Sequence, residues 1–233
     1  LFARRWQEHI RHKIFFGTFR PFNATGYYPL KIGIISCCKS NVSSIANALS
    51  HVGLNPVLLS KPEEACDFLI MPGVGSFDSG IHHLKSSGFY QHIVEHIDTG
   101  KPFMGICLGM QILFNTSEEG TECGLSVLSG HLEKLSDGTE ENSRVAPNIG
   151  YNFVDFSGNK DGHLIGEELN GFYYFLHSYA LKQKPGENLE IGTSKFNNQN
   201  YYSFFVRENI CGIQFHPERS GNRGLLLISR LIE

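Results

Sequence analysis

The alternation of short apolar runs with helical patterns constrains the fold of this chain more than any other feature of its sequence. Four runs have the length and composition of buried strands: 31–36, 56–60, 67–73 and 102–107. Helical patterns are predicted between and after these runs, at about 43–53, 77–97 and from Leu108 onward. This alternation favours an α/β fold with a mostly parallel, doubly wound sheet flanked by helices. Ligands of such sheets bind beyond the carboxyl ends of the strands.

The first helical pattern also suggests where its helix begins and ends. Apolar side chains recur on one face, at Ile45, Ala46, Leu49 and Val52. Ser43 or Ser44 is the expected N-cap, because a hydroxyl can accept the first free N–H groups of a helix. Gly53 is the expected stop, because glycine readily adopts left-handed backbone.

The second half of the chain has a different texture. After about Gly130 a polar, turn-rich stretch leads into aromatic and β-branched runs at 151–156, 172–181, 201–206 and 210–215. Such residues are typical of strands, so we expect an added antiparallel region in the same domain. No composition shift marks a boundary after residue 30, and residues 31–233 are expected to form one domain.

Composition excludes several classes of protein. Of the 233 residues, 41% are hydrophobic and 18% charged, which allows a sizeable core and excludes global disorder. The net charge of −3 gives no reason to expect nucleic acid as a partner, and no apolar run approaches the ~20 residues that span a membrane. The six cysteines lack zinc-site spacing, so we expect reduced thiols, a cytoplasmic location and neither metal nor cofactor.

Residues 1–30 differ from the rest and are treated as a separate N-terminal extension. They contain a single acidic residue, Glu8, against five basic ones: Arg4, Arg5, Arg11, Lys13 and Arg20. Three origins are open: an upstream or cloning-derived extension, a basic targeting segment, or a structural extension. The segment lacks serine and a small-residue cleavage signal, which speaks against a secretory peptide.

Cys107 lies between two glycines in the stretch GICLG, where the fourth apolar run turns into a helical pattern. A thiol attacks as the thiolate, which a helix N-terminus favours. A sharp strand-to-helix turn exposes the sulfur, and Gly105 and Gly109 remove Cβ atoms that would clash there. This is the logic of the G-x-S-x-G nucleophile elbow, with cysteine in place of serine. The alternative is that Cys107 is a small buried hydrophobic residue.

His216 and Glu218 flank a proline in the stretch QFHPE. Pro217 biases His216 toward extended backbone, in which positions i and i+2 point to the same side. Glu218 can then bind one imidazole nitrogen while the other faces a nucleophile, which completes a Cys-His-Glu triad. The alternative is a loop histidine beside a solvated acid.

A third stretch, PGVGSF, follows the third apolar run. Glycines at a strand end can turn backbone N–H groups toward a pocket, and such donors stabilise the oxyanion of acyl transfer by roughly 3–4 kcal/mol each. Gly73 and Gly75 suit any tight turn equally well. This stretch therefore indicates an oxyanion site only in combination with GICLG and QFHPE.

Together the three stretches resemble class I (triad) glutamine amidotransferases, and among them the glutaminase subunits of imidazole glycerol phosphate synthase. The similarity runs from about Lys31 to the C-terminus. It rests on the order PGVG, GICLGMQ, HPE and on more specific stretches: LGMQ at 108–111, PNIGYN at 147–152, FYYFLHSY at 172–179 and GIQFHPERSG at 212–221. PNIGYN departs from the family's P-x-x-G-W-N in having Tyr151 for tryptophan.

The resemblance implies a role for each site residue. Cys107 would attack the side-chain amide of L-glutamine, His216 would carry the proton and Glu218 would orient His216. The oxyanion would be held by backbone N–H groups of Leu108 and of Val74 or Gly75, the latter two after a peptide rotation. The glutamine pocket would use Gln111 and Glu119 for the α-amino and carboxylate ends, with two further residues nearby: His177 and Ser178.

The resemblance also implies a partner, a separate (β/α)₈-barrel cyclase that receives the ammonia and makes imidazole glycerol phosphate in histidine biosynthesis. Two departures bear on the partner face: SCCKSN replaces the family's glycine-rich G-x-G-N turn, and Arg219 replaces the usual lysine. Three alternatives stay open. They are a paralogous subunit that feeds ammonia to another acceptor, such as a surface-polysaccharide sugar, a free-standing γ-glutamyl hydrolase, and a catalytically inactive interaction module.

Overall fold

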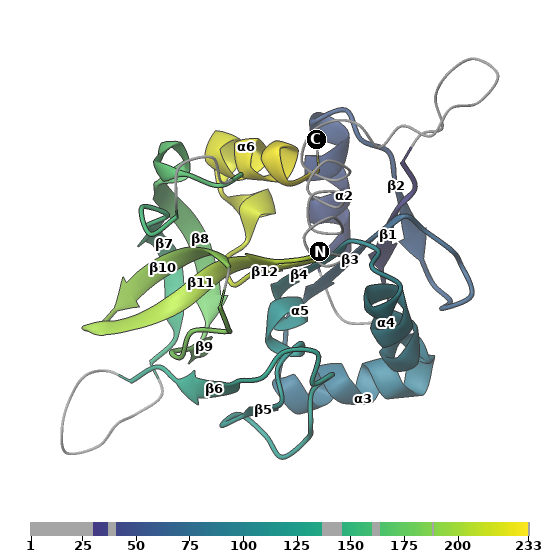
Figure 1. Ribbon diagram of the computed structural model, residues 1–233, viewed down its shortest axis with the longest axis horizontal. Coiled ribbons are helices and arrows are strands. Elements are labelled where there is room, and N and C mark those ends of the chain that lie inside the picture. The colour runs from purple at the N-terminus through teal and green to yellow at the C-terminus, as the bar shows by residue number, and fades with distance from the viewer. Residues whose placement is uncertain (1–29, 37–40, 137–145, 160–163, 188, 233) are drawn as a thin grey trace, which may run out of the picture.

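The computed structural model describes residues 30–36, 41–136, 146–159, 164–187 and 189–232. Within these ranges ten strands form one mixed sheet in the order β2-β1-β3-β4-β12-β11-β9-β6-β5, with β10 paired to β11 (Figure 1). The N-terminal extension, apart from Leu30, lies outside the described residues, as do Cys38, Lys39 and Ser40 of the SCCKSN stretch.

One half of the sheet is parallel, as the alternation of apolar runs predicts. Its strands are β1 (Ile32–Ile35), β2 (Pro56–Leu59), β3 (Phe68–Gly73), β4 (Phe103–Cys107) and β12 (Ile210–Ile213). Neighbours β2-β1, β1-β3, β3-β4 and β4-β12 all pair in parallel. The predicted doubly wound arrangement is confirmed, and the carboxyl ends of β3, β4 and β12 meet at one edge.

The other half is mainly antiparallel, and it confirms the added antiparallel region. Its strands are β5 (Thr116–Ser117), β6 (His131–Lys134), β9 (Tyr179–Leu181), β10 (Glu190–Phe196) and β11 (Gln199–Arg207). A separate two-stranded antiparallel sheet consists of β7 (Asn148–Val154) and β8 (Gly171–His177). Short 3₁₀ turns, η1 (Glu167–Leu169) and η2 (Pro217–Arg219), complete the second half.

The run at 210–215 was expected to be antiparallel, and that prediction is wrong for one of its two pairings. β12 is antiparallel to β11 but parallel to β4, so it joins the two halves of the sheet. The reason is the hairpin between β11 and β12, whose turn contains Glu208 with φ of 52° and which returns the chain beside β4. The pairing of β12 with β4 depends on residues far apart in the sequence, so local patterns do not predict it.

The helices agree with the predicted regions but differ in their limits. They are α2 (Val42–His51), α3 (Phe77–Ser87), α4 (Phe89–Asp98), α5 (Leu108–Gln111) and α6 (Gly221–Ile232). Asn41, rather than Ser43 or Ser44, is the N-cap of α2, and the Ser44 hydroxyl donates to the Asn41 side chain at 2.6 Å. Gly88, with φ of 79°, divides the region predicted over 77–97 into α3 and α4. The helix after Cys107 has only four residues.

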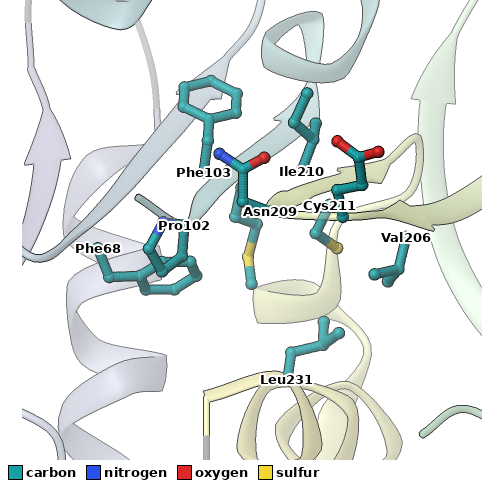
Figure 2. Close-up of a pocket in the computed structure, with 10 residues that line it drawn as sticks. Phe68, Pro102, Phe103, Val206, Asn209, Ile210, Cys211 and Leu231 are labelled. Atoms are coloured by element: carbon teal, nitrogen blue, oxygen red, sulfur yellow. The ribbon is translucent and has the colours of Figure 1, made fainter. Parts of the chain in front are cut away.

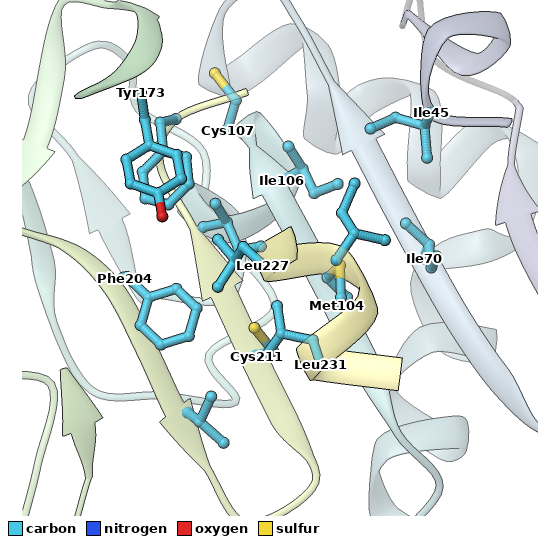
Figure 3. Packing of buried hydrophobic residues seen from close by; sticks show 14 of the residues in the cluster. Ile45, Ile70, Met104, Ile106, Cys107, Tyr173, Phe204, Cys211, Leu227 and Leu231 are labelled. Atoms are coloured by element: carbon cyan, nitrogen blue, oxygen red, sulfur yellow. The ribbon is translucent and has the colours of Figure 1, made fainter. Parts of the chain in front are cut away.

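Two apolar clusters cover the two faces of the sheet. On one face α2 and α6 pack on β4 and its neighbours, with Leu227 and Leu231 of α6 beside Met104 and Ile106 (Figure 3). On the other face α3 and α4 cover the sheet, and Phe103 is part of that cluster. Alternate residues of β4 thus serve opposite layers. No helix among the described residues has the length and apolarity to cross a membrane.

Candidate active site

Cys107 occupies a strained position at the end of β4. Its φ of 54° and ψ of −110° lie outside the regions that side-chain-bearing residues favour, and α5 begins at the next residue. The side chain is 95% buried from solvent and its sulfur points away from the apolar cluster beneath it (Figure 3). Because α5 is a single turn, few peptide dipoles align behind the sulfur, and the helix contributes less than the sequence led us to expect.

The two glycines around Cys107 are required by packing, as predicted. A Cβ atom on Gly109 would lie 1.9 Å from the Met71 carbonyl oxygen of β3, and one on Gly105 would lie 2.3 Å from the Gly109 carbonyl oxygen. Both distances are far inside van der Waals contact with backbone atoms. The turn therefore folds back onto its own strand and onto β3 so closely that only glycine fits.

The PGVG turn lies beside Cys107 because β3 and β4 are paired. Gly73 is the register partner of Cys107, so Val74 and Gly75 leave the sheet next to the sulfur. Gly75 has a φ of 112° and is exposed, and no atom would touch a Cβ placed on it. The residues expected to supply oxyanion donors thus share one strand edge with the start of α5.

His216 and Glu218 form the pair that the H-P-E spacing predicts. His216 has extended backbone, with φ of −102° and ψ of 93°, and Pro217 begins η2. The two side chains are 4% and 1% exposed, and the distance between Nδ1 of His216 and Oε1 of Glu218 is 2.9 Å. The backbone N–H of His216 donates to the Tyr174 carbonyl of β8, which fixes the ring above the sheet edge.

The second ring nitrogen of His216 is the one left for Cys107. Nε2 is buried and forms no hydrogen bond of ordinary geometry within the described residues. Burial alone would lower the pKa of His216, but the Cys107 thiol group and the Glu218 carboxylate outweigh it and raise that pKa to about 10. The raised pKa favours the charged form of the His216 ring, which lies beside Cys107.

The side chains of Gln111 and Glu119 each bind a backbone group of another element. The Nε2 group of Gln111 donates to the Tyr179 carbonyl at 3.0 Å and to Oε1 of Gln214 at 3.1 Å. Oε2 of Glu119 accepts the N–H of Phe77 at 2.8 Å, and burial raises the pKa of this carboxyl. Burial and, after it, the charge of Glu119 raise the pKa of the Tyr179 hydroxyl.

His177 and Ser178 follow each other at the end of β8 but differ in access. His177 is buried, its Nδ1–H donates to the Tyr179 carbonyl at 2.9 Å, and its Nε2 faces the Asn148 amide at 3.4 Å. Burial lowers the pKa of His177 to about 4, so the ring is neutral. Ser178 is half-buried, and its carbonyl accepts the N–H of Leu135. His177 is thus closed to solvent and held by two polar contacts, whereas Ser178 is partly accessible.

Sequence reasoning missed Gln214, which contacts both Gln111 and Cys107. Its Nε2 group lies 3.8 Å from the Cys107 sulfur, and its side chain is fully buried. The signal was present in the quoted stretch GIQFHPE, where a glutamine stands at the end of a strand, but only the pairing of β12 with β4 places it beside Cys107.

A small apolar cleft lies away from this site. It is lined by the start of β4, the start of β12 and Leu231 of α6, with Cys211 among the lining residues (Figure 2). Cys107 is at the opposite end of β4, so the cleft takes no part in the chemistry above. Within the described residues, no group of three or more His, Cys, Asp or Glu side chains is arranged to hold a metal ion.

Comparison with known proteins identifies the family of this chain. Residues 34–228 match the family model described as glutamine amidotransferase class-I. The imidazole glycerol phosphate synthase subunit hisH of Cyanidium caldarium is 34% identical over 211 residues, which cover 86% of this chain and 97% of the relative. The imidazole glycerol phosphate synthase hisHF of Emericella nidulans is 34% identical over 214 residues, which cover 87% of this chain but 38% of that longer protein.

A solved structure supports the fold independently. The PurLQS structure from Thermotoga maritima superposes with a TM-score of 0.65 at 16% identity, covering 88% of this chain and 98% of the matched chain. At that identity the likeness concerns the fold alone. The family match and the relative from Cyanidium caldarium, 97% of which this chain covers, show more than the fold. The chain belongs to the class I glutamine amidotransferases and, within them, to the HisH subunits of imidazole glycerol phosphate synthase.

Proposed function

We propose that this chain is the glutaminase subunit of an imidazole glycerol phosphate synthase in histidine biosynthesis. It hydrolyses L-glutamine to glutamate and ammonia, and the ammonia passes to a cyclase on a separate chain. The observation that carries the proposal is the buried set of Cys107, His216 and Glu218, on a glycine-bounded elbow, in a chain 34% identical to a HisH subunit over 97% of its length.

The reaction begins from the thiolate of Cys107 and the imidazolium of His216. The sulfur attacks the side-chain amide carbon of glutamine and forms a tetrahedral intermediate. His216 then gives its Nε2 proton to the amide nitrogen, the carbon–nitrogen bond breaks and ammonia leaves. The neutral ring next takes a proton from water as the water oxygen attacks the thioester. Breaking the carbon–sulfur bond releases glutamate and restores the ion pair.

Glu218 and the strand-end amides assist without entering the covalent chemistry. Glu218 holds Nδ1–H of His216 at 2.9 Å, which keeps Nε2 directed at the sulfur and stabilises the charged ring. The oxyanion is held by the N–H of Leu108 and by that of Val74 or Gly75. Gly75 is exposed with positive φ and free space around it, which supports a peptide rotation that would bring one of these N–H groups to the oxyanion.

Recognition of glutamine falls to Gln111 and Glu119. Both hydrogens of the Gln111 amide have partners within the protein, so its Oε1 is the atom available to a ligand. That oxygen and the Glu119 carboxylate suit an α-ammonium group, which requires acceptors when it loses its water. Ser178, half-buried beside Tyr179, is the candidate donor to the substrate carboxylate.

The two-stranded sheet supports a partner-binding surface. Ile149, Tyr151 and Phe153 alternate along β7, and their register partners on β8 are Leu176, Tyr174 and Phe172. Five of these six side chains, Tyr174 being the exception, are between 37% and 61% exposed. A contiguous apolar patch of this kind marks a protein interface. We call these six residues the β7–β8 patch.

The patch is connected to the catalytic histidine, which suits a subunit that passes ammonia onward. The Tyr151 hydroxyl donates to the Arg219 carbonyl at 2.9 Å, and the Arg219 guanidinium lies 4.3 Å from the centre of the Tyr174 ring. Arg219 ends η2, the turn that carries Glu218. We propose a (β/α)₈-barrel cyclase as the partner, and a cytoplasmic location, in keeping with the four unpaired cysteines among the described residues.

The alternatives are less well supported. The relatives named above are synthase proteins, which does not favour a sugar-modifying paralogue. A free-standing hydrolase would have no use for the β7–β8 patch, and an inactive module would have no reason to retain a buried, charge-paired triad.

The decisive experiment is a pulldown with the full chain, followed by a glutaminase assay with and without the captured protein. A barrel cyclase should be captured, and glutamate production should rise at least tenfold when it is added. Capture of a sugar-modifying enzyme, or equal turnover by the chain alone, would overturn the proposal. A Cys107→Ala chain serves as the control, because it should capture the same partner without producing glutamate.

A further inference from the structure

Gln214 lies beside the nucleophile on the neighbouring strand. β12 and β4 run in parallel with Ile213 opposite Ile106, so the residues that follow, Gln214 and Cys107, leave the sheet side by side. The backbone N–H of Gln214 donates to Ser203 at 2.9 Å, and its side chain is 0% exposed. A fully buried amide in this position needs partners, and one of them is the Cys107 sulfur at 3.8 Å from Nε2.

The direction of this contact is set by a chain of hydrogen bonds that starts at a backbone carbonyl. The Tyr179 carbonyl can only accept, so the group that Gln111 turns toward it must be the NH₂ group. The same NH₂ group lies 3.1 Å from Gln214, which must therefore present its oxygen to Gln111. This leaves the NH₂ group of Gln214 facing the sulfur. Gln111 thus determines which end of the Gln214 amide the nucleophile meets.

The sulfur also has a neighbour with the opposite preference. The Cys107 thiol can donate to the Leu176 carbonyl of β8 at 3.7 Å, and a carbonyl oxygen favours the protonated sulfur. An N–H donor favours the thiolate instead. The titratable groups around the sulfur are His216, its partner Glu218 and, behind them, the neutral His177. Among the uncharged neighbours described, Gln214 is the donor that opposes Leu176.

We propose that Gln214 is a positioning residue that stabilises the Cys107 thiolate by hydrogen bonding, and that Gln111 holds its amide in the required orientation. The glutamine pocket and the nucleophile are then two ends of one hydrogen-bond chain. The expected effect on glutamine turnover rests on the proposed glutaminase function. The expected effect on the protonation of Cys107 does not, because the thiolate can be measured without glutamine.

The test is the pH dependence of Cys107 alkylation by iodoacetamide in the full chain, followed by peptide mass mapping so that the other cysteines do not interfere. Gln214→Met keeps the length of the side chain but cannot donate. At pH 7 its alkylation rate should fall about ten- to hundredfold, the span expected for one hydrogen bond to a charged group. The pH of half-maximal rate should rise by about 1–2 units. With partner present, kcat should fall similarly and KM should change less than threefold.

Gln199→Met is the matched control. Gln199 is a part-buried amide of β11 that donates to Ser136, away from the sulfur, so its alkylation profile should match the parent. An unchanged profile in Gln214→Met, or a loss confined to KM, would overturn the inference.

If Gln214→Met fails to fold, Gln111→Met carries the test. Loss of the Gln111 amide should free the Gln214 amide to turn. The pH of half-maximal alkylation should then rise by at least half a unit, and an unchanged pH would overturn the inference. Failure of glutamine turnover with a normal alkylation shift would count against the proposed function alone.

Discussion

The edge formed by β3, β4 and β12 and the two-stranded β7–β8 sheet are built in opposite ways. At the strand edge Cys107 is 95% buried, and Gly109 fits only because it has no Cβ. On the β7–β8 sheet, Ile149 and Tyr151 are each 60% exposed, and a Cβ on Gly150 would touch nothing. One region tolerates almost no change in volume, whereas the other presents apolar area to whatever covers it.

The difference separates two requirements of an ammonia-supplying enzyme. Covalent catalysis needs fixed positions and exclusion of water, which close backbone packing provides. Delivery needs a surface that joins another protein, and exposed aromatic side chains provide that. The two regions meet through Tyr174, whose carbonyl accepts the N–H of His216 while its ring contacts Arg219.

The largest expected effect tests the strand edge. Cys107→Ser should fold normally, because serine has nearly the same shape and adopts the same backbone. Its glutaminase rate with partner should fall at least ~10³-fold, as expected when a covalent nucleophile is removed. Steady-state glutamate production measures this, and partner binding by calorimetry should be unchanged. A loss under tenfold would mean that another group attacks glutamine.

Gly109→Ala tests how strictly the strand edge is packed. The added Cβ would lie 1.9 Å from the Met71 carbonyl oxygen, a backbone atom that cannot move aside. We expect the free energy of unfolding to fall by about 3–5 kcal/mol, in the range of severe core changes, with loss of soluble protein. Gly158→Ala is the control, since its Cβ would meet Ile191 at an ordinary 3.5 Å. Equal denaturation midpoints for the two variants would refute the close-packing argument.

The two regions also differ in how well they could be predicted. β3, β4 and the His216–Glu218 pair follow from local signals: apolar runs that end in glycine, and a proline that imposes extended backbone. The pairing of β12 with β4 and the contact of Gln214 with the sulfur depend on residues distant in sequence. β10, with Gly192 and Ser194 among its inward-facing residues, lacks a strong apolar alternation. Local patterns therefore predicted the His216–Glu218 contact and the turn at Cys107 but not the side chains around them.

Acid should destabilise the fold through two buried neutral histidines. Burial lowers the pKa of His96 of α4 and of His177 of β8 to about 4 each. Above the unfolded value of ~6.5 neither ring is charged in either state, so neither affects stability. As pH falls from 6.5 to 4, the unfolded chain binds protons that the folded chain resists, and each histidine lowers the unfolding free energy by up to about 3 kcal/mol.

Substitution separates the two contributions. His96→Gln retains a donor for the Pro102 carbonyl but cannot titrate, so urea denaturation between pH 6.5 and 4 should show a shallower loss of stability than in the parent. His177→Gln should behave likewise for the β7–β8 side. His82→Gln, at a side chain that is 66% exposed, is the control for the removal of a histidine. A parental slope in both buried variants would show that other groups govern the acid response.

The smallest expected effect concerns the exposed surface. Tyr151 combines 60% exposure with a ring contact to Tyr174 and a hydrogen bond to the η2 turn, so it should form a central contact of the β7–β8 patch. Truncation of an aromatic anchor costs more than about 1 kcal/mol at an interface. Tyr151→Ala should therefore raise the Kd for the cyclase about tenfold, measured by titrating partner-stimulated glutaminase activity. Leu226→Ala, equally apolar and 49% exposed but on α6, should bind as the parent does. The reverse result would move the interface to α6 and remove the link between the partner surface and His216.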